Sequence, residues 1–171
     1  MRFLKPALPG LFLFNLLVSS SIVHSADDPV LVVSVKRLSM EVALDIAKAA
    51  VETCRKEGVQ VAATVVDRGG HPQVVLRDVL APDLTLKVSQ QKAYTAMSFN
   101  LATSAMAGRF KGSYSVPKVE GLLVAAGGLP IQAGGNIYGG VGVSGAPSGE
   151  LDEKCAKAGI AAVLDDLEMA D

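Results

Sequence analysis

The chain has 171 residues, with 16 Lys and Arg against 17 Asp and Glu and a formal net charge of −1 at pH 7. Half of the residues are hydrophobic but only 5% are aromatic, and 17 are glycine, so we expect a core of small, closely packed side chains. Because no run of basic residues is present, nucleic acids and anionic membrane surfaces are poor partners.

The first 25 residues have the organisation of a secretory signal peptide. Two basic residues precede an apolar run that ends in HSADD, and this run is too short and too interrupted for a membrane span. We expect cleavage after Ser25, with Ala26 as the second position, and export to a periplasmic or extracellular location. Residues 26–171 then form a single domain, whose net charge of −3 reflects the loss of two basic residues from the full chain.

The first predicted element of this domain is a helix over 39–57, in which apolar residues recur on one face and Gly58 provides the stop. Two β-branched runs follow, over 59–67 and 72–78. The glycine pair at Gly69 predicts a hairpin turn between them.

The second half of the chain adds more helices and strands. We predict a helix over 82–99, a short helix over 103–110, a loop over 111–118, three short strands within 121–146 and a last helix over 148–167. Hairpin-connected strands favour an antiparallel sheet. The predicted fold is therefore α+β: a profilin-like layered domain with a sheet of about five strands flanked by helices.

Residues Gly140 to Gly145 spell G-x-G-x-x-G, the pattern of a dinucleotide-binding turn. Val141 and Val143 alternate with small residues, which indicates a strand passing through the motif. The next helix begins only near Pro147, and acidic residues fill its first turn where a pyrophosphate would bind. We therefore interpret these glycines as positions where the strand packs closely on another backbone or leaves room for a ligand.

Cys54 and Cys155 are the only cysteines, and both fall on predicted helices. Export permits a disulfide between them, but two buried small residues explain them equally well. His71 is the only histidine after cleavage, so one chain cannot build a zinc site from several histidines or cysteines. Its place in or beside the hairpin turn is explained by an ordinary exposed histidine, but it is also the best single metal or haem-iron ligand of the mature chain. Met97 and Met106 are interpreted as core residues.

The helix over 82–99 contains Lys92, a candidate cation for binding an acid. Lys92 flanks a stripe of small residues, so it either extends to water or points its charge into a cleft that binds an acid, with Thr95 adding a hydroxyl on the same side. Arg68 and Arg77 are further candidates for binding a carboxylate, although a solvated role also explains each of them.

Two acids open the last predicted helix. Asp152 and Glu153 are candidate acid–base groups, although their place in a first turn already explains them as partners of the helix dipole.

Four separated motifs together resemble the GlcG/HbpS family, the haem-degrading or haem-binding domain that includes the C-terminal domain of PduO-type proteins. They are VVDRGGHP followed by Arg77 and Asp78, KAYTAMSFN followed by Thr103, GGLPI at Gly127 to Ile131, and GVGVSGAPSGELDEKCAKAGI from Gly140. The resemblance spans about 35–167 and rests on the combination and order of the motifs. It implies a compact antiparallel sheet flanked by helices, commonly assembled into homo-oligomers.

The resemblance also implies haem or a related tetrapyrrole as the ligand, in a cleft or subunit interface beside the second helix. Arginine or lysine donors, drawn from Arg68, Arg77 and Lys92, would hold the propionates, and His71 or Thr95 would approach the iron. The alternatives are an enzyme acting on haem or on a small carboxylate through Lys92, Asp152 and Glu153, and a structural oligomer without a ligand.

Overall fold

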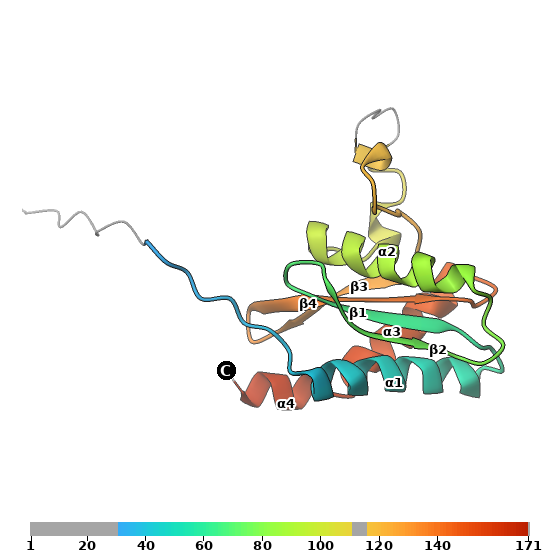
Figure 1. Ribbon diagram of the computed structural model, residues 1–171, viewed down its shortest axis with the longest axis horizontal. Coiled ribbons are helices and arrows are strands. Elements are labelled where there is room, and N and C mark those ends of the chain that lie inside the picture. The colour runs from blue at the N-terminus through green and yellow to red at the C-terminus, as the bar shows by residue number, and fades with distance from the viewer. Residues whose placement is uncertain (1–30, 111–115, 171) are drawn as a thin grey trace, which may run out of the picture. The chain divides into compact units, whose positions relative to one another are not determined.

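A computed structural model describes residues 31–110 and 116–170 of the chain, so the predicted signal peptide lies outside the described residues. Residues 31–33 contain no helix or strand, and the description below concerns the unit that begins at Ser34. Its elements are α1 (Met40–Lys56), β1 (Ala62–Asp67), β2 (Pro72–Arg77), α2 (Leu84–Phe99), two single 3-10 turns (Ser104–Met106 and Val116–Lys118), β3 (Gly128–Ala133), β4 (Asn136–Ser144), α3 (Gly149–Ala161) and α4 (Leu164–Met169) (Figure 1). Within the described ranges, no helix is long and apolar enough to span a bilayer.

The strands form one antiparallel sheet in the order β2-β1-β4-β3, which confirms the predicted α+β class. The sheet has four strands where about five were predicted, because residues 122–126 form no strand. That segment is instead held against α2, since the Thr95 hydroxyl accepts a hydrogen bond from the Leu123 amide at 2.8 Å.

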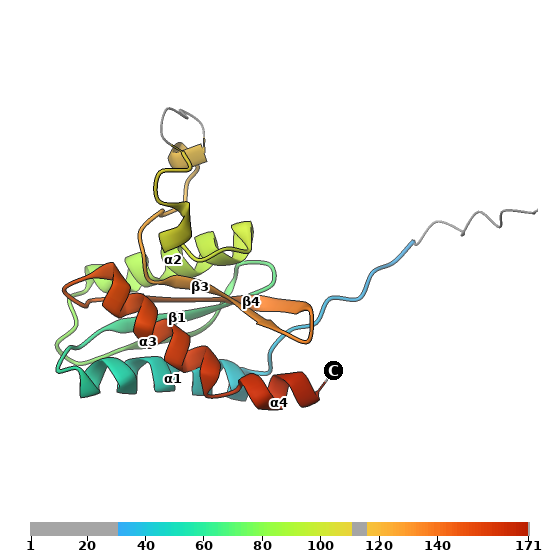
Figure 2. The same cartoon turned by 180° about the vertical axis from the view of Figure 1, so that it is seen from behind.

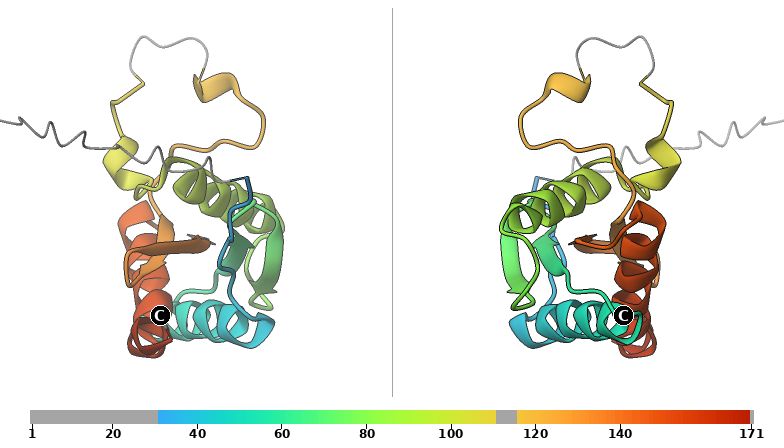
Figure 3. Two further views of the ribbon diagram at one scale, coloured as in Figure 1. Left: turned by 90° about the vertical axis from the view of Figure 1, so that its left-hand side faces the viewer. Right: turned by 90° about the vertical axis from the view of Figure 1, so that its right-hand side faces the viewer.

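Helices cover both faces of the sheet. Helix α2 lies on one face and α1 with α3 on the other, as the views from opposite sides show (Figures 1 and 2). The main core fills the space between the sheet and the α1/α3 layer, where Ile46, Val65 and Val141 are fully buried. The layered arrangement is clearest end-on (Figure 3).

Contact between α2 and the sheet depends on glycine. A Cβ added at Gly142 would lie 2.1 Å from the Ser89 carbonyl oxygen, and one added at Gly140 would lie 2.5 Å from the Ala93 carbonyl oxygen. These distances are too short for any side chain, so the glycines allow strand and helix backbones to touch. The prediction that a strand passes through the G-x-G-x-x-G motif is confirmed, since β4 spans most of it.

Two predicted helices differ from the observed ones. The short helix over 103–110 is only the 3-10 turn Ser104–Met106. The last helix is divided into α3 and α4, because Val163 adopts φ −128° and ψ 2° and buries its side chain in the core.

Of the two alternatives for the cysteines, the structure contains the disulfide. Cys54 of α1 and Cys155 of α3 are joined with a Cα–Cα distance of 5.6 Å across 101 residues of sequence, and both are fully buried. The bond therefore ties together the two helices of one layer.

Candidate functional site

The exposed side of α2 forms one wall of a hollow in the surface. Residues at positions i, i+3, i+4 and i+7 of a helix share one face, and this spacing aligns Lys87, Gln90, Gln91 and Tyr94. Gly70, in the β1–β2 turn, and the pair Glu120 and Gly121 complete the lining. The hollow has a volume of about 350 Å³, within the range of small-molecule sites. We refer to these seven residues as the α2 groove.

The Tyr94 ring is packed between two glycines of the groove. A Cβ at Gly70 would lie 2.6 Å from the ring, and one at Gly121 would lie 3.6 Å from its other edge. Gly70 also has φ +84°, a conformation that side chains rarely adopt. The hairpin turn and the 120–121 segment thus hold the aromatic ring from two sides.

Asp67 fixes the shape of that hairpin turn. Its Oδ1 accepts hydrogen bonds from the Gly69 amide at 2.8 Å and the His71 amide at 3.0 Å, and its Oδ2 lies 3.4 Å from the guanidinium of Arg37. Burial opposes ionisation of this carboxyl, but the two amide donors and Arg37 outweigh it and lower the pKa of Asp67.

The pH dependence of an Asp67→Asn variant tests this arrangement. Because the folded pKa of Asp67 is lowered, the carboxylate stabilises the fold above its unfolded pKa of about 3.9, and this stabilisation is lost as the pH falls further. We expect urea unfolding midpoints of wild type and variant to be separated at pH 7 and to converge below about pH 4. A separation that stays constant down to pH 2 would contradict the assignment.

His71 directly follows Gly70 in the chain but is not one of the residues that line the groove. Its side chain is 79% exposed, and Nδ1 lies 3.4 Å from Asp67 Oδ1. The imidazole is thus exposed beside Asp67, and its predicted role as an iron ligand stays a prediction.

Thr95 is fully buried beneath the groove and does not line it. Its hydroxyl donates to the Gln91 carbonyl at 2.7 Å and accepts from the Leu123 amide at 2.8 Å. Both bonds are internal, so the structure gives Thr95 the role of attaching the segment that contains Gly121 to α2.

A Thr95→Val variant tests this attachment. Valine has nearly the same shape but leaves the Leu123 amide without its partner, which costs about 1–3 kcal/mol of folding stability. We expect a lower unfolding midpoint and faster hydrogen exchange at Leu123, both restored by Thr95→Ser. Unchanged exchange at Leu123 in the valine variant would show that the bond does not hold the segment.

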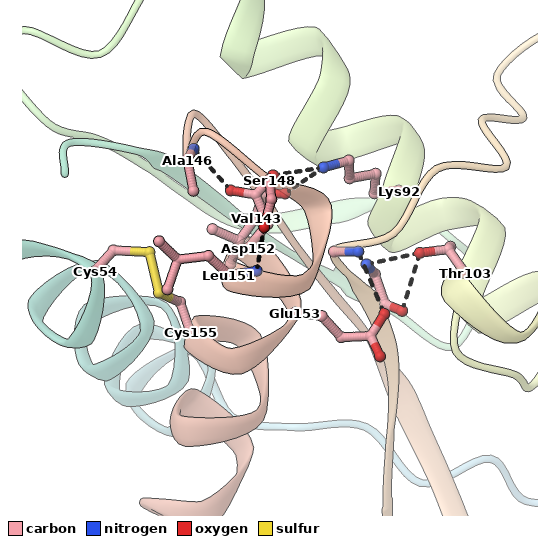
Figure 4. Close-up of polar contacts among 12 residues, drawn as sticks. Cys54, Lys92, Thr103, Val143, Ala146, Ser148, Leu151, Asp152, Glu153 and Cys155 are labelled. Atoms are coloured by element: carbon pink, nitrogen blue, oxygen red, sulfur yellow. Dashed lines mark hydrogen bonds and ion pairs between the residues drawn. A yellow bond between two sulfur atoms is a disulfide. The ribbon is translucent and has the colours of Figure 1, made fainter. Parts of the chain in front are cut away.

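Lys92 takes neither of the two orientations predicted for it. Its side chain is only 5% exposed, and Nζ lies 2.8 Å from Asp152 Oδ2 and donates to the Val143 carbonyl at 3.0 Å (Figure 4). The other carboxylate oxygen of Asp152 accepts from the Ala146 amide at 3.0 Å. Burial raises the pKa of Asp152, while Lys92 and Ala146 act in the opposite direction. The pair joins α2, β4 and α3 inside the domain.

Glu153 is also engaged within the domain. It accepts a hydrogen bond from the Ser104 hydroxyl at 2.8 Å and a longer one from the Gly127 amide at 3.4 Å. The first turn of α3 is capped by Ser148, whose hydroxyl accepts from the Leu151 amide at 3.3 Å. Asp152 and Glu153 therefore have structural partners beyond the helix dipole.

The two candidate arginines lie outside the α2 groove. Arg68 donates to the sulfur of Met97 at 3.7 Å, and Arg77 donates to the Ala81 carbonyl. Met97 and Met106 are buried, which confirms their interpretation as core residues. The structure thus brings together none of Arg68, Arg77 and Lys92 in the hollow, and the cation that lines it is Lys87.

A family model described as "Haem degrading protein HbpS-like" matches residues 38–161, which include α1, the whole sheet and α3. The chain belongs to this HbpS-like family. Both the predicted family and the predicted fold are thereby confirmed.

Solved structures of this family agree with the fold. A crystal structure of HbpS is 40% identical, with a TM-score of 0.74, and the match covers 77% of this chain and 94% of that one. A double mutant of HbpS from Streptomyces reticuli is 39% identical, with a TM-score of 0.74 and coverage of 81% and 98%. A structure described as a PduOC:Heme complex is 28% identical, with a TM-score of 0.68 and coverage of 74% and 94%. No curated protein matches the chain.

Lys87 and Tyr94 were missed as site residues by the sequence reasoning, which concentrated on Lys92 and Thr95. Lys92 and Thr95 are buried, whereas Lys87 and Tyr94, five and one residues before them on the same helix, line the groove. The signal was present: the stripe of small residues that includes Ser89, Ala93 and Ala96 marks the face of α2 packed on the sheet. The helical period places Lys87 and Tyr94 on the side of the helix away from this stripe, which is the open face.

Proposed function

We propose that this HbpS-like protein binds haem in the α2 groove. Three findings support the proposal: the chain belongs to a family of haem-degrading proteins, a relative with the same fold is described as a heme complex, and the groove is the hollow that α2 shares with the hairpin turn. The last of these carries the location, because it places a cation, an aromatic ring and glycine backbone around one space.

The residues of the groove fit a flat, acid-bearing molecule. Lys87 supplies an exposed ammonium group for a propionate, while Gly70 and Gly121 present backbone without side chains beside the Tyr94 ring. Glu120 is the one acid in the lining and would repel a propionate, which favours the Lys87 end for the carboxylates. Bound haem would supply redox-active iron. His71 and Tyr94 provide imidazole and phenol groups at the hairpin end.

Titration of the mature protein with haemin tests this proposal. We expect a saturable Soret shift at micromolar protein and weaker binding for Lys87→Glu, which replaces the groove's cation with an anion. Lys48→Glu is the matched control, because Lys48 lies on α1, across the sheet from the groove. The Lys48 ammonium lies 4.0 Å from the Glu52 carboxylate, and an exposed ion pair of this kind contributes little to folding stability. Absence of saturable binding in the wild type would end the proposal.

We also propose that the protein is exported. The predicted signal peptide motivates this, and the Cys54–Cys155 disulfide supports it, because disulfides persist in oxidising compartments. The mature protein should be recovered from the periplasm or medium with Ala26 at its N-terminus. Recovery of the full-length chain from the cytoplasm alone would contradict export.

Self-association is a further part of the proposal. Four apolar side chains within residues 75–84 are between 44% and 77% exposed: Val75, Val79, Leu80 and Leu84. Exposed apolar residues gathered in one stretch are typical of an interface between subunits. Light scattering should give a mass above that of one chain, and Leu80→Glu should lower it.

A further inference from the structure

We propose that the phenol oxygen of Tyr94 is the ligand that this protein offers to the ferric iron of haem. This inference rests on the proposed function and goes further, since it names the iron ligand. It is carried by one juxtaposition: a tyrosine ring packed between Gly70 and Gly121 in the α2 groove, with a hydroxyl that has no hydrogen-bond partner among the residues that the structure describes.

The position of the ring is determined by its surroundings. One ring edge faces Gly70 and the other faces Gly121, so the two loops restrict its rotation. Because this packing already restricts the half-buried ring, the side chain loses little conformational freedom when it binds a ligand. The hydroxyl is therefore presented from a preorganised ring, which is what an iron ligand requires.

The position of the positive charge in the groove agrees with iron bound at Tyr94. Lys87 precedes Tyr94 by about two helical turns on the same face of α2, which is roughly 10 Å along the helix axis. A macrocycle centred near the phenol therefore extends toward the ammonium group, where a carboxylate on its edge gains a charge-assisted hydrogen bond.

Other nearby donor groups are less suited to this task. Thr95 is fully buried and uses its hydroxyl in two internal hydrogen bonds. The sulfur of Met97 accepts from Arg68. His71 projects into solvent with 79% of its side chain exposed, so it lacks the packing that would hold its ring against a metal.

The chemistry needs no other protein group. Tyrosine oxygen is an established proximal ligand of haem iron. Binding forms an oxygen–iron bond as the phenol proton leaves to solvent, and the iron stays ferric, so no oxidant or reductant takes part.

A pair of variants and a pair of ligands test the assignment. The mature wild type, Tyr94→Phe and His71→Ala are titrated with haemin and with metal-free protoporphyrin. We expect Tyr94→Phe to weaken haemin binding by about tenfold or more and to leave protoporphyrin binding within about twofold, because only haemin has iron to coordinate. The wild-type complex should show phenolate vibrations in its resonance Raman spectrum, which Tyr94→Phe removes and His71→Ala retains.

Each other outcome overturns the assignment. Equal loss of haemin and protoporphyrin in Tyr94→Phe would make Tyr94 a packing residue, and loss of the iron signature in His71→Ala would give the role to His71. Saturable haemin binding without a phenolate signature in the wild type would reject this inference and keep the proposed function, whereas absence of binding would reject both. Thermal unfolding of Tyr94→Phe checks its fold, which we expect to be unchanged because the hydroxyl holds no described residue.

Discussion

Replacement of both cysteines by alanine is expected to lower the melting temperature of the mature protein by roughly 10–20 °C. The disulfide joins positions 101 residues apart, and closing a loop of this length restricts the unfolded chain by about 4–5 kcal/mol at 25 °C. Both cysteines are also fully buried, so removal of the sulfurs costs packing at the junction of α1 and α3. Calorimetry of wild type and Cys54→Ala/Cys155→Ala measures the difference.

The reductant separates the two contributions. Wild type unfolded in dithiothreitol keeps its sulfur atoms but loses the cross-link, so the gap between reduced wild type and the double variant reports packing alone. The double variant itself should not respond to dithiothreitol. Equal melting temperatures for oxidised and reduced wild type, with reduction confirmed by thiol counting, would show that the cross-link contributes nothing.

The parts of the fold that follow from local sequence were predicted correctly. The apolar period of residues 39–57 gave α1, whose observed bounds differ by one residue at each end. The glycine pair between two β-branched runs gave the β1–β2 hairpin, because the positive φ of Gly70 is a requirement of the turn itself. The rejection of a dinucleotide loop also depended on local features, namely the alternation within the motif and the acidic first turn of the helix that follows it.

What the sequence did not reveal was decided by contacts between distant residues. Residues 122–126 are as apolar as a strand, but Thr95 of α2 binds the Leu123 amide and the segment stays outside the sheet. The partner of Lys92 lies 60 residues away on α3, so no spacing rule could distinguish a buried lysine from one that extends to water. The groove follows the same logic, since Gly70 and Gly121 meet Tyr94 only through tertiary packing.

Lys92→Met is expected to destabilise the fold by about 3–5 kcal/mol at pH 7, because it leaves the Asp152 carboxylate buried without its counter-charge. The deficit should depend on pH with a definite sign. Burial already raises the pKa of Asp152, and loss of Lys92 removes an opposing effect, so the pKa rises further. A carboxyl with a raised folded pKa loses stability as the pH increases from its unfolded to its folded value, and the variant should therefore recover toward wild type as the pH falls to about 4. Urea unfolding between pH 4 and 8, with Lys87→Met on the exposed face of α2 as the matched control, measures this recovery.

The double variant Lys92→Met/Asp152→Leu shows whether the charge itself is responsible. With both charges replaced by apolar groups of similar size, neither member of the pair leaves an unpaired charge behind, so we expect the double variant to be more stable than Lys92→Met and to lose its distinctive pH dependence. Its remaining deficit should come from the Val143 carbonyl and the Ala146 amide, which lose the hydrogen bonds that Lys92 and Asp152 provide. If instead the double variant is as unstable as the sum of the losses in Lys92→Met and in Asp152→Leu alone, the pair acts through these backbone bonds more than through its charges. Lys92 would then serve mainly to hold β4 against α2.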